Sequence, residues 1–379
     1  MVAKKFLSAL IDLISMKAIS AIKIAKKLIS LNSENPPATR TECGEFVFDF
    51  LKNIGLKPIK QPVTDKLFNV IVVGKGPILI QGHLDTVPFG DVKKWKYNPT
   101  GQIVKDKFFG RGIADMKGNV ACFLSALQKS PTDQLSMAFT AIEETSFIAI
   151  EKAMELKKTL FKHVKYSITI EPTDGKLITC NKGQFWFEIT AKGRTAHSSS
   201  PEKGINAIEK LVEIIPKIKK YEKEINKRRH ALLGKATLSI GKIEGGTAPN
   251  IVPDHASMTI DRRVLTSENP KQIIKEMEAV CAPNKIKLLK QIDPAETPKS
   301  SKIVKFMQKI LTSQKIDSKI YGYPATAELS EIRKHGIEGV IFGPSMLSQA
   351  HRENEYMTLK ELEIGEKIYS KIIEFASKI

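Results

Sequence analysis

77-PILIQGHLDTVP-88 is the stretch that decides the fold: a short apolar run that ends in glycine, histidine and aspartate. Similar runs, each about the length of a strand, lie at 68-FNVIVVG, 136-SMAFTAI and 166-YSITIEP. Helical patterns lie before and between these runs, at residues 41–53 and from about Lys117 onward. Strands that alternate with helices predict an α/β domain with a mostly parallel sheet and helices on both faces.

Residues 182–291 have a different pattern. Strand-like and helical segments follow one another there as 184-QFWFEITAKG, 204–229, 236-ATLSIGKI, 256-ASMTIDRRV and 268–281. This order predicts an α+β (ferredoxin-like) layer of helices on a mostly antiparallel sheet. The α/β pattern resumes near residue 293, with the strand EGVIFGP from residue 338 and a closing helix at 359–378. We therefore predict one domain of residues 1–181 and 292–379, into which 182–291 is inserted.

The composition is that of a soluble globular protein, with 42% hydrophobic and 27% charged residues. No run of 18 apolar residues exists, so a membrane span is not predicted. The chain has 60 Lys and Arg and 41 Asp and Glu, which gives a net charge of +19. Most of the excess is lysine at helical intervals, as in 214-IIPKIKKYEKEINKRR, without the interleaved aromatics of a nucleic-acid groove. We interpret it as solvated helix faces, with an anionic partner as the alternative.

The cysteines and the N-terminus bear on the compartment. The four cysteines form no CxxC pair, which argues against a structural zinc site or disulfides and predicts a reducing, cytoplasmic setting. Residues 1–30 begin with lysines and an apolar run, but Asp12 interrupts the run and no small-residue cleavage pattern follows. The helical spacing of the apolar residues predicts an amphipathic helix. A transit peptide or a surface-binding helix is the alternative.

Two groups of polar residues come early in the predicted α/β domain. In 82-GHLDTVP, His83 and Asp85 face one side of an extended strand, so the carboxylate can fix one ring nitrogen of a metal-binding histidine. A surface pair is the simpler interpretation of so short a motif. In 110-GRGIADMKGNVACF, Asp115 precedes an apolar helix. There it either caps the helix or presents a carboxylate that can bridge two cations.

Three further groups follow predicted strands. Glu143 and Glu144 come after 136-SMAFTAI, and one of two adjacent carboxylates can bind a metal while the other accepts a proton. Glu171 closes the strand that starts at residue 166, and His351 lies in the loop 343-GPSMLSQAHRENEY. Each also fits an exposed turn or loop. Together, two histidines and three carboxylates at strand ends of one sheet suit two cations, with zinc first and manganese or cobalt as alternatives.

Taken together, these motifs resemble the M20 metallopeptidase family, in particular its branch of acetylornithine deacetylases and succinyl-diaminopimelate desuccinylases. From about residue 22 to the C-terminus, the matching strings are 82-GHLDTVPFGD, 110-GRGIADMKG, 143-EETS, 171-EPTDG, 193-GRTAHSSSPEKGINAI, 245-GGTAPNIVP and 349-QAHRENEY. The chain departs from the family's pattern at Ile142, Ile170 and Ser345. These positions bear on loop shape and substrate choice more than on the metal site.

The resemblance implies which residues hold the metals. His83 and Glu171 would bind one zinc ion. Glu144 and His351 would bind the other. Asp115 would bridge the two ions, because a carboxylate has two oxygens to share between them.

The resemblance also implies roles beside the metals. Asp85 would orient its neighbouring histidine, and Glu143 would be the general base that takes a proton from the attacking water. The inserted domain resembles the family's lid and dimerisation domain. In a homodimer, His197 of this domain would reach the partner subunit's active site and stabilise the oxyanion. Asn250 and Arg263 match positions that contact substrate, the arginine by binding a carboxylate in bidentate fashion.

The expected reaction is zinc-dependent hydrolysis of the amide bond of a small N-acyl amino acid, as in arginine or lysine biosynthesis. HSSSPEKGINAI and QAHRENEY are closer to acetylornithine deacetylases, whereas NPP at 35–37 and GRGIADMKGNVACF are closer to desuccinylases. Acetylornithine deacetylation is therefore our first hypothesis, followed by desuccinylation and then by a di- or tripeptidase. A binding protein without turnover would lack a ligand or the base, and none is missing. Nucleic-acid binding through the positive charge is the alternative of a different class.

Overall fold

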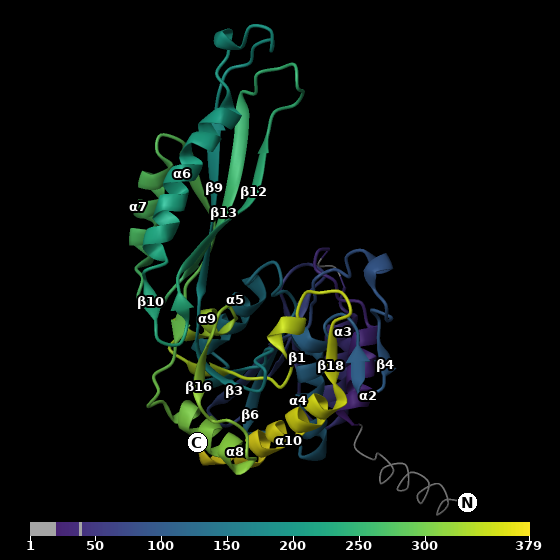
Figure 1. The fold of residues 1–379 in the computed structure, drawn as a ribbon. Coiled ribbons are helices and arrows are strands. Elements are labelled where there is room, and N and C mark those ends of the chain that lie inside the picture. Colours follow the sequence, from purple (N-terminus) through teal and green to yellow (C-terminus); the bar gives the residue numbers. More distant parts are fainter. Residues whose placement is uncertain (1–19, 38–39) are drawn as a thin grey trace, which may run out of the picture. The chain divides into compact units, whose positions relative to one another are not determined.

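The computed structural model describes residues 20–37 and 40–379 (Figure 1). The predicted N-terminal amphipathic helix lies outside the described residues up to residue 19, and the first described helix is α2 (Ala21–Ser30). The chain divides into two compact units. The first comprises the residues up to Thr179 together with Thr297–Ile320 and Glu331–Ile379, and the second comprises Cys180–Glu296 and Tyr321–Ser330.

The first unit is built on a sheet whose four central strands run parallel. Their order is β6 (Leu135–Thr140), β3 (Ile78–His83), β7 (Tyr166–Thr169) and β17 (Glu338–Ile341). Antiparallel strands flank them, with β2 (Phe68–Val72) and β1 (Ile59–Pro62) beyond β6, and β8 (Leu177–Asn181) beyond β17. The predicted α/β fold is confirmed. Parallel pairing is confined to the centre of the sheet, where helical crossovers join β3 to β6 and β6 to β7.

Helices cover both faces of this sheet. Side chains alternate along β3, so Ile78 and Ile80 enter the main core while Leu79 points to the other face. The helices that close the main core are α2, α3 (Glu42–Asn53), α4 (Gly118–Lys129), α8 (Lys302–Ser313) and α10 (Leu359–Phe375). A separate apolar cluster holds α5 (Ile148–Glu155), which packs on β2 and β6. Among the helices of the described residues, none is both long and apolar enough to cross a membrane.

The remaining helical elements of the described residues are short. They are the helical turns Val92–Lys94, Ile113–Lys117, Leu156–Lys158, Pro201–Lys203, Leu347–Gln349 and Ala376–Lys378 and the short helix α9 (Leu329–Lys334).

A small three-stranded sheet in the first unit brings two distant loops together. Its strands are β4 (Gln102–Val104), β5 (Lys107–Phe109) and β18 (Tyr356–Thr358). Because Tyr356 pairs with Phe109, the residues after β5 lie beside the residues before β18. Gly110 there donates its main-chain N–H to the carbonyl of Glu355 at 3.0 Å. These two loops carry Asp115 and His351.

The second unit has the βαββαβ order of a ferredoxin-like fold. One antiparallel sheet in the order β12-β13-β9-β14 contains β9 (Gly183–Lys192), β12 (Thr237–Gly245), β13 (His255–Val264) and β14 (Lys285–Ile292). The helices α6 (Ala207–Ile225) and α7 (Pro270–Cys281) pack on one face of it (Figure 1). Three short strands are β10 (Arg229–His230), β11 (Gly234–Lys235) and β15 (Ala295–Glu296).

One segment that we predicted for the first domain belongs to the second unit. Tyr321–Ser330, which includes most of β16 (Ile320–Tyr323), packs there instead of with the residues on either side of it. A Cβ atom on Gly322 would stand 2.6 Å from the carbonyl oxygen of Leu232, and Arg263 donates a hydrogen bond to the hydroxyl of Thr326 at 3.1 Å. So short a segment has no periodicity that would reveal this packing in the sequence.

Helix α3 offers a test of the core. Its buried residues Cys43, Val47, Phe50 and Leu51 form one stripe at helical spacing. Leu51→Ala leaves a cavity at a fully buried position, so we expect the free energy of unfolding to fall by about 2–5 kcal/mol. The exposed neighbour Lys52 offers a control. Lys52→Ala should change the free energy of unfolding by less than about 0.5 kcal/mol. Chemical denaturation measures both, and equal stabilities of the two variants would contradict the packing of α3.

Candidate active site

His83 is the last residue of β3, and its two ring nitrogens have different surroundings. Nδ1 lies 3.0 Å from the carbonyl oxygen of Asp85 and 3.3 Å from its carboxylate. Nε2 points away from this loop and lies 3.2 Å from Oδ1 of Asp115. A histidine that ligates a metal usually has its second nitrogen held in this way, which fixes the orientation of the ring.

Asp115 stands at the centre of the site. It does not cap α4, which begins at Gly118 without a side-chain cap. Its Oδ1 lies 3.2 Å from Nε2 of His83, and its Oδ2 lies 3.3 Å from Nε2 of His351. Each oxygen of one carboxylate therefore faces a different imidazole, so the bridging interpretation fits this geometry and the helix-cap interpretation does not.

His351 and Glu144 form the second flank of the site. Nε2 of His351 lies 3.1 Å from Oε2 of Glu144, whose other oxygen accepts a hydrogen bond from the main chain of Val87 at 3.3 Å. The backbone of His351 has a φ of 61°, in the left-handed region that few residues other than glycine adopt. Such strain persists where the surrounding structure holds it, and it is concentrated at functional sites. The His351 side chain is 53% exposed, whereas that of His83 is 1% exposed.

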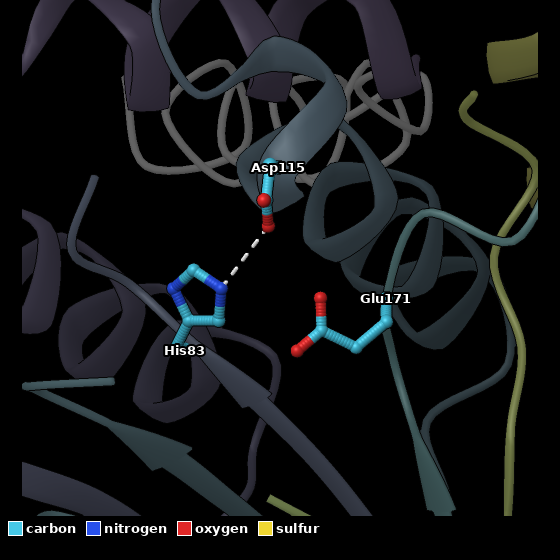
Figure 2. A group of neighbouring side chains, drawn as sticks. All are labelled: His83, Asp115 and Glu171. Carbon is cyan, nitrogen blue, oxygen red and sulfur yellow. Dashed lines mark hydrogen bonds and ion pairs between the residues drawn. The ribbon is translucent and has the colours of Figure 1, made fainter. Parts of the chain in front are cut away.

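Glu171 follows β7 by two residues and completes the buried flank. Figure 2 shows its carboxylate and the side chains of His83 and Asp115 pointing toward one another from three different segments. The position of Glu171 depends on a glycine, because a Cβ atom on Gly343 would stand 2.2 Å from the carbonyl oxygen of Glu171. The β7 and β17 strands are neighbours, so the ends of both contribute to this flank.

Two groups of metal-ligating atoms result from this arrangement. One comprises His83, Asp115 and Glu171, the other Asp115, Glu144 and His351, and within each group the candidate ligand atoms lie within 4.8 Å of one another. Imidazole and carboxylate without thiolate are the ligand types of open catalytic zinc sites and also suit manganese or cobalt. The residues present therefore fit divalent cations, with Asp115 common to both groups.

The electrostatics of the site also favour divalent cations. Hydrogen bonds with Asp115 and Glu144 raise the pKa of His351 to about 11. Burial lowers the pKa of His83, but hydrogen bonds with Asp115 and Asp85 outweigh it, and the pKa is raised well above its ordinary value. Burial raises the pKa of Glu144. Protein groups alone thus leave an excess of negative charge that draws protons onto the histidines, and divalent cations would supply positive charge in their place.

Asp85 holds the loop that carries the paired glutamates. Its carboxylate is buried and accepts main-chain hydrogen bonds from Glu143 at 3.0 Å and from Glu144 at 3.2 Å. It also accepts a hydrogen bond from Nδ2 of Asn35 at 2.8 Å, and Asn35 in turn accepts one from the hydroxyl of Thr145. We did not predict this role of Asn35, although it begins the NPP string at 35–37. Glu143 itself is half-buried, next to the ligand candidate Glu144.

Ser345, at which the chain departs from the family's pattern, also has a structural role. Its hydroxyl donates to the carbonyl of Ala114 at 2.7 Å and accepts from Nδ2 of Asn119 at 2.7 Å. All of these atoms are buried. The serine therefore supports the turn immediately before Asp115, which the sequence alone does not indicate.

The other predicted site residues belong to the second unit. His197 pairs with Ile251 in an isolated bridge, and its Nδ1 lies 2.7 Å from the hydroxyl of Ser199. The main-chain carbonyl of Asn250 accepts a hydrogen bond from Ser198, so the segments of His197 and Asn250 are adjacent. Arg263 pairs with the carboxylate of Asp261 through two hydrogen bonds of 2.9 and 3.0 Å. The roles of these three residues stay predictions.

Comparison with known proteins identifies the family. A model of the peptidase dimerisation domain matches residues 179–287. The chain is 31% identical to the acetylornithine deacetylase of Buchnera aphidicola subsp. Schizaphis graminum, over 94% of this chain and 97% of that protein. The chain belongs to the M20 family. This M20 hydrolase is also 27% identical to the acetylornithine deacetylase of Pasteurella multocida, over 93% of this chain and 96% of that protein.

Solved structures agree on the fold. An M20 family metallo-carboxypeptidase from Sulfolobus solfataricus superposes with a TM-score of 0.79 at 19% identity, over 95% of this chain and 100% of that chain. Relatives of the M20 hydrolase therefore include proteins named as deacetylases and as a peptidase, and the fold does not separate the two.

Asp85 provides a test of the site that does not require a substrate. Asp85→Ala removes the partner of His83 and the acceptor for the Glu143–Glu144 main chain, so we expect affinity for Zn²⁺ to fall about 10- to 100-fold. Chelator competition measures the affinity. The exposed Asp91→Ala is the control, because Asp91 caps only a short helical turn. Unchanged affinity in Asp85→Ala would show that Asp85 does not support the metal site through His83 and the Glu143–Glu144 main chain.

Proposed function

We propose that this M20 hydrolase is a two-cation amidohydrolase that removes the acyl group of an N-acyl amino acid. The observation that carries the proposal is the position of Asp115, whose two carboxylate oxygens face His83 and His351 in two separate groups of ligand atoms. A single cation would not require a carboxylate placed in this way between two histidines. Zinc is the proposed metal, with cobalt or manganese as substitutes.

Each group of ligand atoms would hold one cation. His83 and Glu171 would bind the first and Glu144 and His351 the second, with Asp115 shared between them. When bound, two such cations polarise an amide carbonyl and lower the pKa of water enough to make it a nucleophile near neutral pH. Asp85 keeps Nδ1 of His83 occupied, so that Nε2 stays available as a ligand.

Glu143 is the proposed general base. Its main chain is fixed by Asp85, while its side chain belongs to a residue directly next to the ligand Glu144. In the proposed reaction its carboxylate accepts the proton of the attacking water and passes it to the leaving amine as the C–N bond breaks. The general base contributes about 100- to 10,000-fold in rate in such reactions.

The second unit supplies the proposed substrate contacts. We assign His197 to stabilisation of the oxyanion in the partner subunit's active site, and the match to the peptidase dimerisation domain supports a homodimer. Asn250 is assigned to substrate binding. Arg263 would exchange its pairing with Asp261 for the substrate's carboxylate, because a guanidinium binds either carboxylate in the same bidentate geometry.

Acetylornithine is the substrate that we place first, which would give the protein a step in arginine biosynthesis. The two deacetylases that align over nearly the whole chain support this choice. Desuccinylation of N-succinyl-diaminopimelate, in lysine biosynthesis, and cleavage of di- or tripeptides are the alternatives. The similarity in fold to the metallo-carboxypeptidase from Sulfolobus solfataricus is the reason to keep a peptidase among the alternatives.

A substrate panel tests the proposal. Protein loaded with Zn²⁺ or Co²⁺ is assayed against N-acetylornithine, N-succinyl-diaminopimelate and a set of dipeptides. We expect the highest kcat/KM for N-acetylornithine, because the chain aligns with acetylornithine deacetylases over nearly its whole length. A dipeptide as the best substrate would overturn the deacylase assignment while leaving the two-cation site intact.

The role of Glu143 is tested by separating metal binding from turnover. Glu143→Gln keeps the size of the side chain but removes the base, so kcat should fall about 100- to 10,000-fold with metal content unchanged. His351→Ala is the matched comparison, since it removes a ligand and should lower the metal content. Metal analysis together with steady-state kinetics distinguishes the two, and wild-type turnover in Glu143→Gln would show that another group is the base.

A further inference from the structure

A buried ion pair lies beside the candidate metal groups in the first unit. Nη1 of Arg111 donates to Oε2 of Glu355 at 2.8 Å, and the two side chains are 4% and 1% exposed. Neither residue is among the candidate ligands. A buried ion pair is weak evidence for stability, because removing two charges from water costs about as much as their attraction returns. Its position therefore needs another explanation.

Glu355 organises the turn that carries Asp115. Besides the guanidinium, its carboxylate accepts main-chain hydrogen bonds from Gly112 at 3.0 Å, Ala114 at 2.8 Å and Asp115 at 3.2 Å. Four donors from one turn thus converge on one carboxylate. Gly112 makes this turn possible, since its φ of 83° is left-handed and a Cβ atom there would stand 2.4 Å from Cγ2 of Thr86.

Arg111 extends the same network to two other segments. Its Nε donates to the carbonyl of Pro88 at 3.2 Å, and its Nη1 donates to the carbonyl of Arg352 at 3.1 Å. Its guanidinium also lies over the ring of Trp95, 5.2 Å from the centroid. The planar fork of arginine can serve several acceptors at once, which a lysine ammonium at the end of a flexible chain does less well.

Each of the three segments joined in this way carries a candidate ligand. Pro88 ends the loop that starts at His83, Arg111 and Gly112 precede Asp115, and Arg352 follows His351 directly. We propose that Arg111 and Glu355 are positioning residues that set the distance between His83, Asp115 and His351, and thereby the geometry of both cation sites. This inference rests on the proposed two-cation function, but it concerns residues that bind neither cation.

The proposal predicts a specific defect in Glu355→Gln. A carboxamide has one acceptor oxygen, and its NH₂ group would face either the guanidinium or a main-chain N–H, donor against donor. The turn at 112–115 should shift. We expect the affinity for Co²⁺ to fall about 10- to 100-fold, and the visible absorption spectrum of bound Co²⁺, which reports its coordination geometry, to change.

The experiment uses the full-length chain and Co²⁺ alone as the probe. Cobalt affinity is measured by calorimetry and the spectrum by absorption, for wild type, Glu355→Gln and Leu51→Ala. Leu51→Ala lowers stability through the core and should bind Co²⁺ with wild-type affinity and spectrum. A Glu355→Gln protein with wild-type affinity and spectrum would overturn the proposal, as would equal losses of affinity in both variants.

Arg111→Lys keeps the proposal testable if Glu355→Gln does not fold. Lysine retains the positive charge opposite Glu355 but does not reach Pro88 and Arg352 at the same time. A Co²⁺ affinity below wild type with an altered spectrum supports the positioning role, and unchanged cobalt binding overturns it. Because no substrate is involved, failure of the deacylase assignment leaves this test unaffected. Wild-type protein that binds no cation would overturn the proposed function instead.

Discussion

The candidate site depends on how the repulsion between the carboxylates that converge on Asp115 is compensated. Glu144 and Glu171 lie in the two groups that share this residue, and little of Asp115 or Glu171 is exposed to water. Like charges in such a place raise the free energy of the folded chain unless positive charge compensates them. The raised pKa of His351 reflects this need, because a protonated imidazole supplies positive charge to Asp115 and Glu144. Divalent cations would satisfy it better, because each one would neutralise two charges and bind both imidazole and carboxylate.

The architecture makes this convergence possible by two separate means. Parallel pairing places the ends of β3, β6 and β7 at one edge of the sheet, where His83, the Glu143–Glu144 pair and Glu171 follow. His351 comes from a segment far along the chain, and the pairing of β18 with β5 brings its loop to Asp115. The main sheet therefore supplies His83, Glu144 and Glu171, and the small sheet brings in Asp115 and His351.

The five candidate ligands could be named from the sequence because their chemistry is a property of the side chains. The structure brings them together in two groups, and their role as ligands stays a prediction. Histidines and carboxylates at the ends of apolar runs can be recognised without knowing what surrounds them. Asn35, Arg111 and Ser345 escaped prediction because their contacts are largely with other polar groups that only the folded chain brings near. We predicted Tyr321–Ser330 for the first domain, and this was wrong for the same reason. Its packing in the second unit depends on contacts with Leu232 and Arg263 that only the folded chain provides.

The two flanks of Asp115 differ in exposure, and this difference has a consequence for the proposed chemistry. His83 and Glu171 are buried, so a cation between them would be enclosed by protein and would also hold Asp115 in place. His351 is half exposed and strained in its backbone, and Glu144 beside it adjoins the proposed base Glu143. In the proposed reaction a substrate carbonyl would therefore approach from the side of His351 and Glu144, next to the proposed base Glu143. The buried flank would thus stabilise the site, and the substrate would bind on the exposed flank.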